Sequence, residues 1–334
     1  MKPLKMAVIG LKMGNVHVRS LRQLPGVEIA AVVDLDLAHA EKIAADVGAR
    51  PYAGCEAMLE GEKELDGVIL ATPARVRREP ITAICERGLA LFCEKPPALN
   101  QAEAREIEAV IARTGILNAV GFMYRWNPLA ERMREMIAGR PRLLARSIVA
   151  WPVLDWVARG AASPMLRTKA GCGGMLVEQG VHFQDALRYI TGDEPIAVSA
   201  AGELGTIHPK EGRDCEETIA YCLRHASGML STHLHNWSHH GALLELQIVG
   251  ETFDLTWRIH ENPSLYGTVD GKPISLSEKS DDYFREIEGF AEAIRRQDQS
   301  LIRSSYADAS RSLAVCESIE NALARPLMPI EPFS

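Results

Sequence analysis

Short apolar runs alternate with amphipathic stretches over the first 122 residues. An apolar run bounded by turn residues is typical of a strand buried on both faces, and the segments between the runs have helical periodicity. Strands that alternate with helices indicate a doubly wound parallel α/β sheet. The expected strands are 6–9, 27–33, 51–52, 68–71, 89–93 and 117–122, and the expected helices are 18–24, 37–47, 56–60, 81–87 and 101–113.

The pattern changes near residue 123. After a helix that ends near residue 138, several segments alternate polar and apolar positions, which is typical of antiparallel strands with one solvated face. We therefore predict a Rossmann-type domain over 1–122 and an α+β domain with a largely antiparallel open sheet over 123–334. Expected strands of the second domain are 145–149, 197–201, 219–223, 229–235 and 242–249, and its expected helices are 175–189, 282–296 and 306–323.

Composition narrows the class of protein. A chain of 334 residues favours two domains, and 47% hydrophobic residues indicate a globular fold. A net charge of −7 without a basic block argues against a nucleic-acid partner. No apolar run reaches the ~18 residues of a membrane span, and the chain enters a strand without a signal-peptide pattern, so we expect a cytoplasmic protein. The seven cysteines are scattered and predict neither a disulfide framework nor a zinc site.

A glycine turn follows the first expected strand. Gly10 to Gly14 departs from the G-x-G-x-x-G pattern, because Lys12 stands where a second glycine is usual. Alone, such a turn is equally typical of a plain structural connection. The second strand ends at Asp34, close to the spacing of ~20 residues for an acidic residue that binds the ribose. A carboxylate there would repel a 2′-phosphate, which favours NAD, whereas Lys12 leaves NADP open.

Ligands of doubly wound sheets lie beyond the carboxyl ends of the strands. The glycine turn, Asp34 and Thr72-Pro73 all fall at such ends, and so does Glu94-Lys95-Pro96-Pro97. Lys95 follows a buried run directly, so its amine can be partly desolvated and its turn is stiffened by proline. The alternative is a surface lysine paired with Glu94.

The expected helix 175–189 carries Glu178, His182 and Asp185 on one face. An imidazole beside a carboxylate is a candidate general base with a pKa near neutrality. The alternative is a His–Asp pair that satisfies itself on a half-buried helix. His235, His239 and His240 have no cysteine or carboxylate at tight spacing, so we expect no metal.

These segments together resemble the glucose-fructose oxidoreductase / inositol dehydrogenase / MocA (Gfo/Idh/MocA) family. The motifs, which occur in the family's order along nearly the whole chain, are the glycine turn to His17, Asp34, 66–73, Glu94-Lys95-Pro96, 124–128, the G-x-H-x-x-D within 173–185, Phe290–Ile294 and Asp308. The resemblance implies a pyridine nucleotide, and a C-terminal sheet whose open face often forms a dimer. Besides Lys12, two positions depart from the family pattern: Arg77 stands at a usual histidine and Glu178 at a usual aspartate.

The resemblance also implies roles for the candidate residues. His182 would remove the hydroxyl proton, Lys95 would stabilise the charge on the substrate oxygen, and Asp185 would orient the substrate. Expected cofactor contacts are Gly10, Leu11, Lys12, Met13, Gly14, Asp34, Thr72, Pro73, Arg77, Glu94, Lys95 and Arg125. Weaker candidates for substrate contacts, besides Lys95, His182 and Asp185, are Arg125, Trp156, Arg159, Arg167, His235 and His239.

The resulting hypothesis is an NAD(P)-dependent oxidoreductase without a metal. It would transfer a hydride between the nicotinamide and a secondary alcohol of a sugar, an inositol-like polyol or a sugar derivative. Two alternatives stay open: a non-catalytic regulator of the same fold that binds nucleotide and sugar, and a redox-neutral enzyme that cleaves glycosides with bound NAD. We expect a homo-dimer or homo-tetramer formed through the C-terminal sheet.

Overall fold

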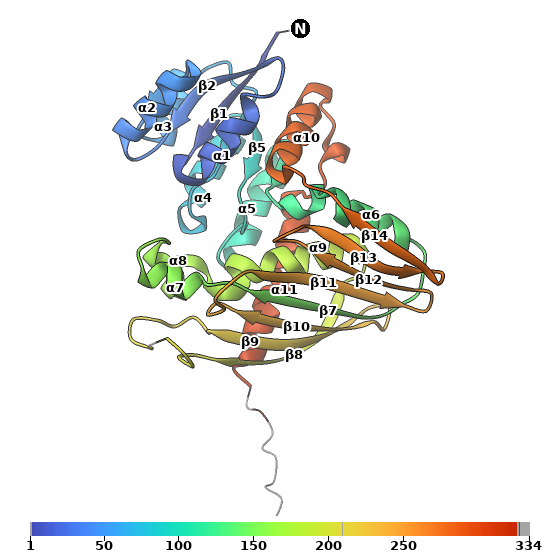
Figure 1. Ribbon diagram of the computed structural model, residues 1–334. Coiled ribbons are helices and arrows are strands. Elements are labelled where there is room, and N and C mark those ends of the chain that lie inside the picture. Colours follow the sequence, from blue (N-terminus) through green and yellow to red (C-terminus); the bar gives the residue numbers. More distant parts are fainter. Residues whose placement is uncertain (1, 209, 326, 328–334) are drawn as a thin grey trace, which may run out of the picture. The chain divides into compact units, whose positions relative to one another are not determined.

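The computed structural model describes residues 2–208, 210–325 and 327, and the chain forms two compact units (Figure 1). The first unit contains the chain up to Asn127 together with Ser280–Leu313. The second contains Pro128–Lys279 and the chain from Ala314 onward. The sequence-based division at 122/123 did not foresee that the segment 280–313 belongs with the first unit.

The first unit is built on a six-stranded sheet in the order β3-β2-β1-β4-β5-β6. All of its strand pairs are parallel, which confirms the doubly wound fold class. Its strands are β1 (Leu4–Ile9), β2 (Val27–Val33), β3 (Arg50–Tyr52), β4 (Gly67–Leu70), β5 (Ala90–Cys93) and β6 (Asn118–Val120). Its helices are α1 (Leu11–Leu21), α2 (Leu37–Val47), α3 (Cys55–Gly61), α4 (Arg78–Glu86), α5 (Gln101–Thr114) and α10 (Asp282–Arg296).

Helix α10 is part of the core of the first unit although it follows the second unit in sequence. Its buried residues Ile287, Phe290 and Ala291 belong to the same apolar cluster as Val8 and Phe92 of the central strands. The apolar positions of α10 recur at helical spacing, so this face is hidden only when it packs on a second element. Burial of the α10 face explains why the segment 280–313 belongs with the Rossmann sheet.

The second unit is built on an eight-stranded sheet in the order β14-β13-β12-β11-β7-β10-β9-β8. Only β7 and β10 pair in parallel within this sheet, and the other pairs are antiparallel. Its strands are β7 (Arg142–Ala150), β8 (Pro195–Glu203), β9 (Thr218–His225), β10 (Leu230–Asn236), β11 (Leu243–Gly250), β12 (Phe253–Arg258), β13 (Ser264–Val269) and β14 (Lys272–Ser277). Strands β12, β13 and β14 were not predicted from the sequence.

One face of this sheet is covered and the other is exposed. Along β10 the side chains of Ser231, His233 and His235 are buried, whereas Leu230 and Leu234 are more than half exposed. Helix α9 (Val181–Thr191) lies against the covered face, where Phe183 contacts His235 edge to face at 5.9 Å (Figure 1). The other helices of this unit are α6 (Pro128–Ile137), α7 (Val153–Ala158) and α8 (Lys169–Cys172), and α11 (Tyr306–Leu323) spans the division at residue 313.

Candidate active site

The glycine turn of the first unit consists of a single residue. Gly10 has φ +86°, and a Cβ there would lie 2.9 Å from the backbone of Ala71 and Thr72. Both facts require glycine, since other residues rarely adopt this φ and no side-chain atom would fit. Helix α1 therefore begins at Leu11, whereas the sequence predicted a helix only from Val18.

Asp34 closes this turn from the end of β2. Its Oδ2 accepts the amide hydrogen of Leu11 at 2.9 Å, and its Oδ1 accepts that of Asp36 at 3.1 Å. The Asp34 side chain keeps 21% of its surface exposed, so its remaining lone pairs can still accept hydroxyl groups. The sequence-based contact of Asp34 with a ribose stays a prediction.

The same turn fits a dinucleotide. The first-turn amides of a helix are donors without helical partners, and the helix dipole favours an anion there. The absence of a side chain at Gly10 lets this turn lie directly against the backbone of Ala71 and Thr72, at the end of β4. Beside it, the buried hydroxyl of Thr72 has no hydrogen-bond partner among the residues that the structure describes. Lys12 is exposed and Met13 half-buried in this first turn.

Lys95 lies in a turn whose backbone carbonyls accept hydrogen bonds from the buried side chain of Arg77. The guanidinium of Arg77 is 3% exposed and donates to backbone carbonyls of Thr72, at 2.7 Å, and of Lys95, at 3.4 Å. It also donates to the carbonyls of Glu94 and Pro96. The sequence suggested a cofactor contact for Arg77. In the structure its guanidinium shapes the Lys95 turn by donating to these carbonyls, and the cofactor contact stays a prediction.

Glu94 is buried and is bonded on both sides. Its Oε1 lies 2.7 Å from Nε2 of His17, and its Oε2 accepts the amide hydrogen of Lys95 at 3.0 Å. Burial alone would raise the pKa of Glu94. The hydrogen bond and charge of His17, followed by the charges of Lys95 and Arg77, outweigh burial and lower this pKa. An ionised Glu94 thus fixes the backbone at Lys95. This structural role differs from the predicted cofactor contact of Glu94, which stays a prediction.

Arg125, a predicted cofactor and substrate contact, is also engaged inside the first unit. Its guanidinium is 4% exposed, pairs with the carboxylate of Asp308 at 2.5 Å and donates to the carbonyl of Arg303. Arg303 donates back to the carbonyl of Arg125 at 2.7 Å, and its guanidinium lies 4.0 Å from the ring centre of Trp126. These contacts fix the short 3₁₀ segment Met123–Trp126.

The second unit carries the other two predicted catalytic residues on α9. Asp185 is fully buried and His182 is half-buried, and they are one helical turn apart. The regular helix expected over 175–189 is wrong at its start, because Leu176–Gly180 forms a π-helical turn. Glu178 lies in that turn, so its angular relation to His182 is not that of an α-helix.

Four candidate substrate contacts lie at the surface of the second unit. Trp156 of α7 is 37% exposed and meets Trp151 edge to face at 5.4 Å. Arg159 is exposed and pairs with Asp155 on the same helix. Arg167 is exposed as well, and His239 is half-buried beside the backbone of Gly241. All four remain predictions as substrate contacts.

His235 differs from these four. Its side chain is fully buried, and its Nε2 lies 2.9 Å from the hydroxyl of Tyr221, which also accepts a bond of 2.6 Å from Gln184 of α9. Burial lowers the pKa of His235 to about 3. This neutral histidine ties the sheet to α9, and its burial corrects the sequence-based suggestion of a substrate contact.

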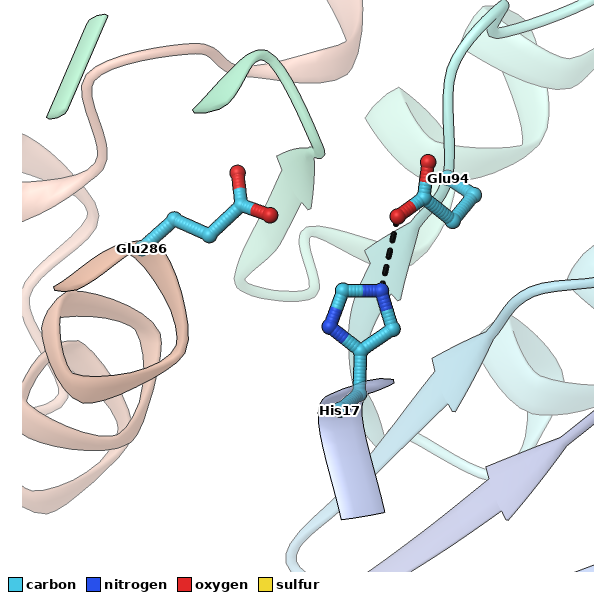
Figure 2. Close-up of side chains that lie close together, drawn as sticks. All are labelled: His17, Glu94 and Glu286. Atoms are coloured by element: carbon cyan, nitrogen blue, oxygen red, sulfur yellow. Dashed lines mark hydrogen bonds and ion pairs between the residues drawn. The ribbon is translucent and has the colours of Figure 1, made fainter. Parts of the chain in front are cut away.

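Sequence reasoning missed two buried side chains near Lys95. His17 lies on the covered face of α1 with Gly14 and Leu21, and Glu286 lies on the covered face of α10. The spacing of Gly14, His17 and Leu21 places them on one face of a helix, and this pattern could have indicated that His17 is buried. Together with Glu94 they form the cluster drawn in Figure 2. Among the described residues, it is the only group of three or more histidine, cysteine or acidic side chains close enough to share a metal ion.

Each unit contains a segment that matches a known protein family. Residues 4–122 match a family described as "Oxidoreductase family, NAD-binding Rossmann fold". Residues 129–255 match the "GFO/IDH/MocA C-terminal domain". Within the described part of the chain, no helix has the length and apolar character needed to cross a membrane.

Individual relatives agree with this assignment. The chain is 31% identical over 224 residues to the rhizopine catabolism protein MocA of Rhizobium meliloti, covering 66% of this chain and 68% of that one. It is 24% identical over 337 residues to scyllo-inositol 2-dehydrogenase (NAD(+)) of Bacillus subtilis, covering 97% and 95%. The fold matches an oxidoreductase domain protein from Kribbella flavida with a TM-score of 0.83, at 19% identity and 97% coverage of both chains.

Proposed function

Because this chain belongs to the Gfo/Idh/MocA family of NAD-binding oxidoreductases, we propose that it oxidises a secondary alcohol of a sugar, polyol or sugar derivative with NAD. The observation that carries the proposal is the buried support of Lys95, which follows β5 in the same unit as the glycine turn. The names of its relatives, an inositol dehydrogenase and a rhizopine catabolism protein, support a polyol-like substrate.

The first unit would hold the cofactor. Gly10 and the first-turn amides of α1 would bind the pyrophosphate, and Asp34 would bind ribose hydroxyls. The carboxylate of Asp34 favours NAD over NADP, because a 2′-phosphate would carry a like charge into its neighbourhood. When bound, NAD supplies the hydride acceptor.

Three residues would handle the proton and the charge. His182 would take the proton of the substrate hydroxyl on an imidazole nitrogen, since a neutral imidazole accepts a proton near neutral pH. The ammonium of Lys95 would hold the substrate oxygen and stabilise negative charge on it, and Asp185 would orient the substrate. The Arg77 and Glu94 contacts would keep the Lys95 turn fixed throughout.

The test is a substrate panel with a paired variant. Purified protein is mixed with NAD or NADP and a series of sugars, inositols, uronic acids and glycosides, and reduced nicotinamide is followed by absorbance. We expect turnover with NAD on a polyol or sugar. The double variant Lys95→Ala/His182→Ala should bind NAD as the wild type does and lose turnover. Unchanged turnover in that variant would exclude both roles.

Three other outcomes would redirect the proposal. NAD binding without turnover on any compound would favour a regulator. Cleavage of a glycoside without net reduction of NAD would favour the redox-neutral alternative. A preference for NADP would mean that Lys12 outweighs Asp34 in the choice of cofactor.

The exposed face of the second unit supports a homo-oligomer. Leu144, Leu230 and Leu234 lie on neighbouring strands and are 46%, 57% and 51% exposed. Contiguous exposed apolar residues are typical of protein interfaces. We expect a dimer or tetramer through this sheet, to be measured by light scattering. All seven cysteines are free, which fits the reducing cytoplasm as the place of action.

A further inference from the structure

A buried cluster of three side chains links α1, the turn after β5 and α10 within the first unit. His17 is fully buried, and Glu94 and Glu286 are 3% and 2% exposed. One nitrogen or oxygen of each lies within 4.8 Å of the other two (Figure 2). Because Glu94 precedes Lys95 directly, the cluster lies next to the candidate catalytic turn.

Two members of the cluster are bonded directly and reach Lys95. Nε2 of His17 lies 2.7 Å from Oε1 of Glu94. An ionised carboxylate only accepts hydrogen bonds, so Nε2 carries the hydrogen of this contact. The second oxygen of Glu94 accepts the amide hydrogen of Lys95 at 3.0 Å. His17 therefore acts on the backbone of Lys95 through one carboxylate.

Glu286 completes the cluster from α10. Figure 2 shows its carboxyl group directed toward His17 and Glu94. Both of its oxygens, and Nδ1 of His17, are buried without a hydrogen-bond partner among the described residues. Such groups are costly in a protein interior unless they satisfy one another. The atoms of the cluster lie within 4.8 Å of one another, which is close enough for a contact through one water.

The charges around Glu286 favour its neutral form. Burial is the main cause that holds the pKa of Glu286 well above the ordinary glutamate value, and the negative charge of Glu94 acts in the same direction. Asp282 and Asp281, at the start of α10, raise this pKa further. The other groups nearby are His17 on α1 and Tyr283, whose hydroxyl is held neutral by burial because its pKa is raised. A neutral carboxyl group can donate a hydrogen bond, which a carboxylate cannot.

A metal centre fits this geometry less well. Around a tetrahedral zinc with bonds of about 2.0–2.1 Å, ligand atoms lie about 3.3 Å apart. The 2.7 Å between Nε2 of His17 and Oε1 of Glu94 is shorter and is an ordinary hydrogen bond. A carboxyl group that keeps its proton is also a poor ligand.

We propose that Glu286 is a positioning residue that holds the Lys95 turn in place through His17 and Glu94. Its neutral carboxyl group fixes the ring of His17, His17 fixes Glu94, and Glu94 fixes the amide of Lys95. The functional meaning rests on the proposed function, in which Lys95 is catalytic. The physical link between Glu286 and Lys95 does not depend on it.

The experiment measures Lys95 directly, in full-length protein without NAD or substrate. The rate of acetylation of Lys95 by acetic anhydride is followed by peptide mass spectrometry between about pH 7 and about pH 10, the range in which lysine amines titrate. The variants are Glu286→Ala, which removes the carboxyl group, and Glu286→Gln, which keeps a neutral polar group of similar shape. Glu62→Gln is the matched control, because Glu62 is equally buried but bonds Arg50 and Tyr52.

We expect Glu286→Ala to raise the acetylation rate of Lys95 about threefold to tenfold, the factor that one net hydrogen bond represents. Glu286→Gln should restore the rate to the wild-type value, and Glu62→Gln should leave it unchanged. Acetylation of the exposed Lys12 is the internal reference, since it should be equal in all four proteins.

Three results would overturn the proposal. The first is unchanged Lys95 acetylation in Glu286→Ala, which would leave Glu286 with a role in packing alone. The second is a change in Glu286→Gln as large as in Glu286→Ala, which would mean that the carboxylate is the acting form. The third is one zinc ion bound per wild-type chain and lost in Glu286→Gln, which would make the cluster a metal site.

Folding of the variants is checked by circular dichroism and thermal unfolding. If Glu286→Ala does not fold, His17→Gln takes its place, because it removes the next contact in the same sequence and should also raise Lys95 acetylation. Failure of the proposed function would look different. Absence of turnover on every substrate, with the acetylation changes as expected, would leave the positioning role standing.

Discussion

Lys95 of the first unit and two candidate substrate contacts of the second unit are held in opposite ways. In the first unit, Lys95 is surrounded by buried partners, with Arg77 and Glu94 bonded to the backbone of its turn. In the second unit, Trp156 and Arg159 lie at the surface. Buried polar networks fix geometry, whereas exposed side chains can be exchanged at little cost in stability. On the proposed function, the buried contacts keep Lys95 in a constant geometry, whereas Trp156 and Arg159 leave the choice of substrate adjustable.

The largest expected effect is on turnover. Lys95→Met removes the ammonium that would stabilise charge on the substrate oxygen, and we expect kcat to fall by about 10²–10³-fold. The affinity for NAD, measured by fluorescence titration, should stay within a factor of about two, because the cofactor would be bound by the glycine turn. Lys63→Met is the matched control, since it removes an exposed lysine of the same unit. Equal losses in the two variants would contradict the special role of Lys95.

The next effect is on stability. Arg77→Met leaves several buried carbonyls without their donor, and we expect the free energy of unfolding to fall by about 3 kcal/mol. The neighbouring Arg78 is exposed and pairs with Glu106 at the surface, so Arg78→Met should have little effect. Urea unfolding followed by tryptophan fluorescence measures both. A small effect of Arg77→Met would mean that the Lys95 turn does not depend on this residue.

Two buried groups, one in each unit, should contribute to stability with opposite pH dependence. In the second unit, burial lowers the pKa of His235 to about 3. The unfolded imidazole takes up a proton below about pH 6.5 and the folded one does not, so stability falls as pH drops through that range. In the first unit, the raised pKa of Glu286 means that the folded chain keeps a proton that the unfolded chain loses above about pH 4.5. Its contribution to stability therefore falls as pH rises.

Two variants separate these contributions. Relative to the wild type, His235→Gln should gain stability as pH falls from about 6.5 to about 5, and Glu286→Gln should gain stability as pH rises from about 5 to about 8. Unfolding by urea at several pH values measures both differences. The exposed His240→Gln is the control and should follow the wild type throughout. Parallel pH profiles for the wild type and either variant would show that the residue titrates alike in both states.

Much of the fold was accessible from the sequence because its signals are local. The apolar run 27–33 and the helices 37–47, 282–296 and 306–323 were predicted with the observed bounds, and the family resemblance is confirmed. Strands β12 to β14 were missed because they are short and weakly patterned. The membership of α10 in the first unit depends on contacts far apart in sequence, and no local pattern reports such contacts.

The candidate site likewise contains residues that could be predicted from the sequence and residues that could not. Gly10 and Lys95 could be singled out because they follow buried strands, where ligands of parallel sheets bind. The internal use of Arg77 could not be foreseen, since a charged side chain is normally exposed. The burial of His235 could not be foreseen either, because His235 is the last residue of the expected strand 229–235 and is followed directly by a polar, histidine-rich stretch. In both cases the partners come from other elements, and only the folded chain brings them together.

The smallest expected effect is also the sharpest test of the comparison. Trp156→Ala removes an exposed ring that would stack on a sugar or polyol, and we expect KM for the substrate to rise about tenfold with kcat nearly unchanged. The melting temperature should stay within about 2 °C, because the ring is not part of the core. Leu143→Ala, another exposed apolar residue of this unit, should change neither quantity. A large loss of stability, or a fall in kcat equal to that of Lys95→Met, would contradict the view that the second unit adjusts substrate choice without carrying the chemistry of Lys95.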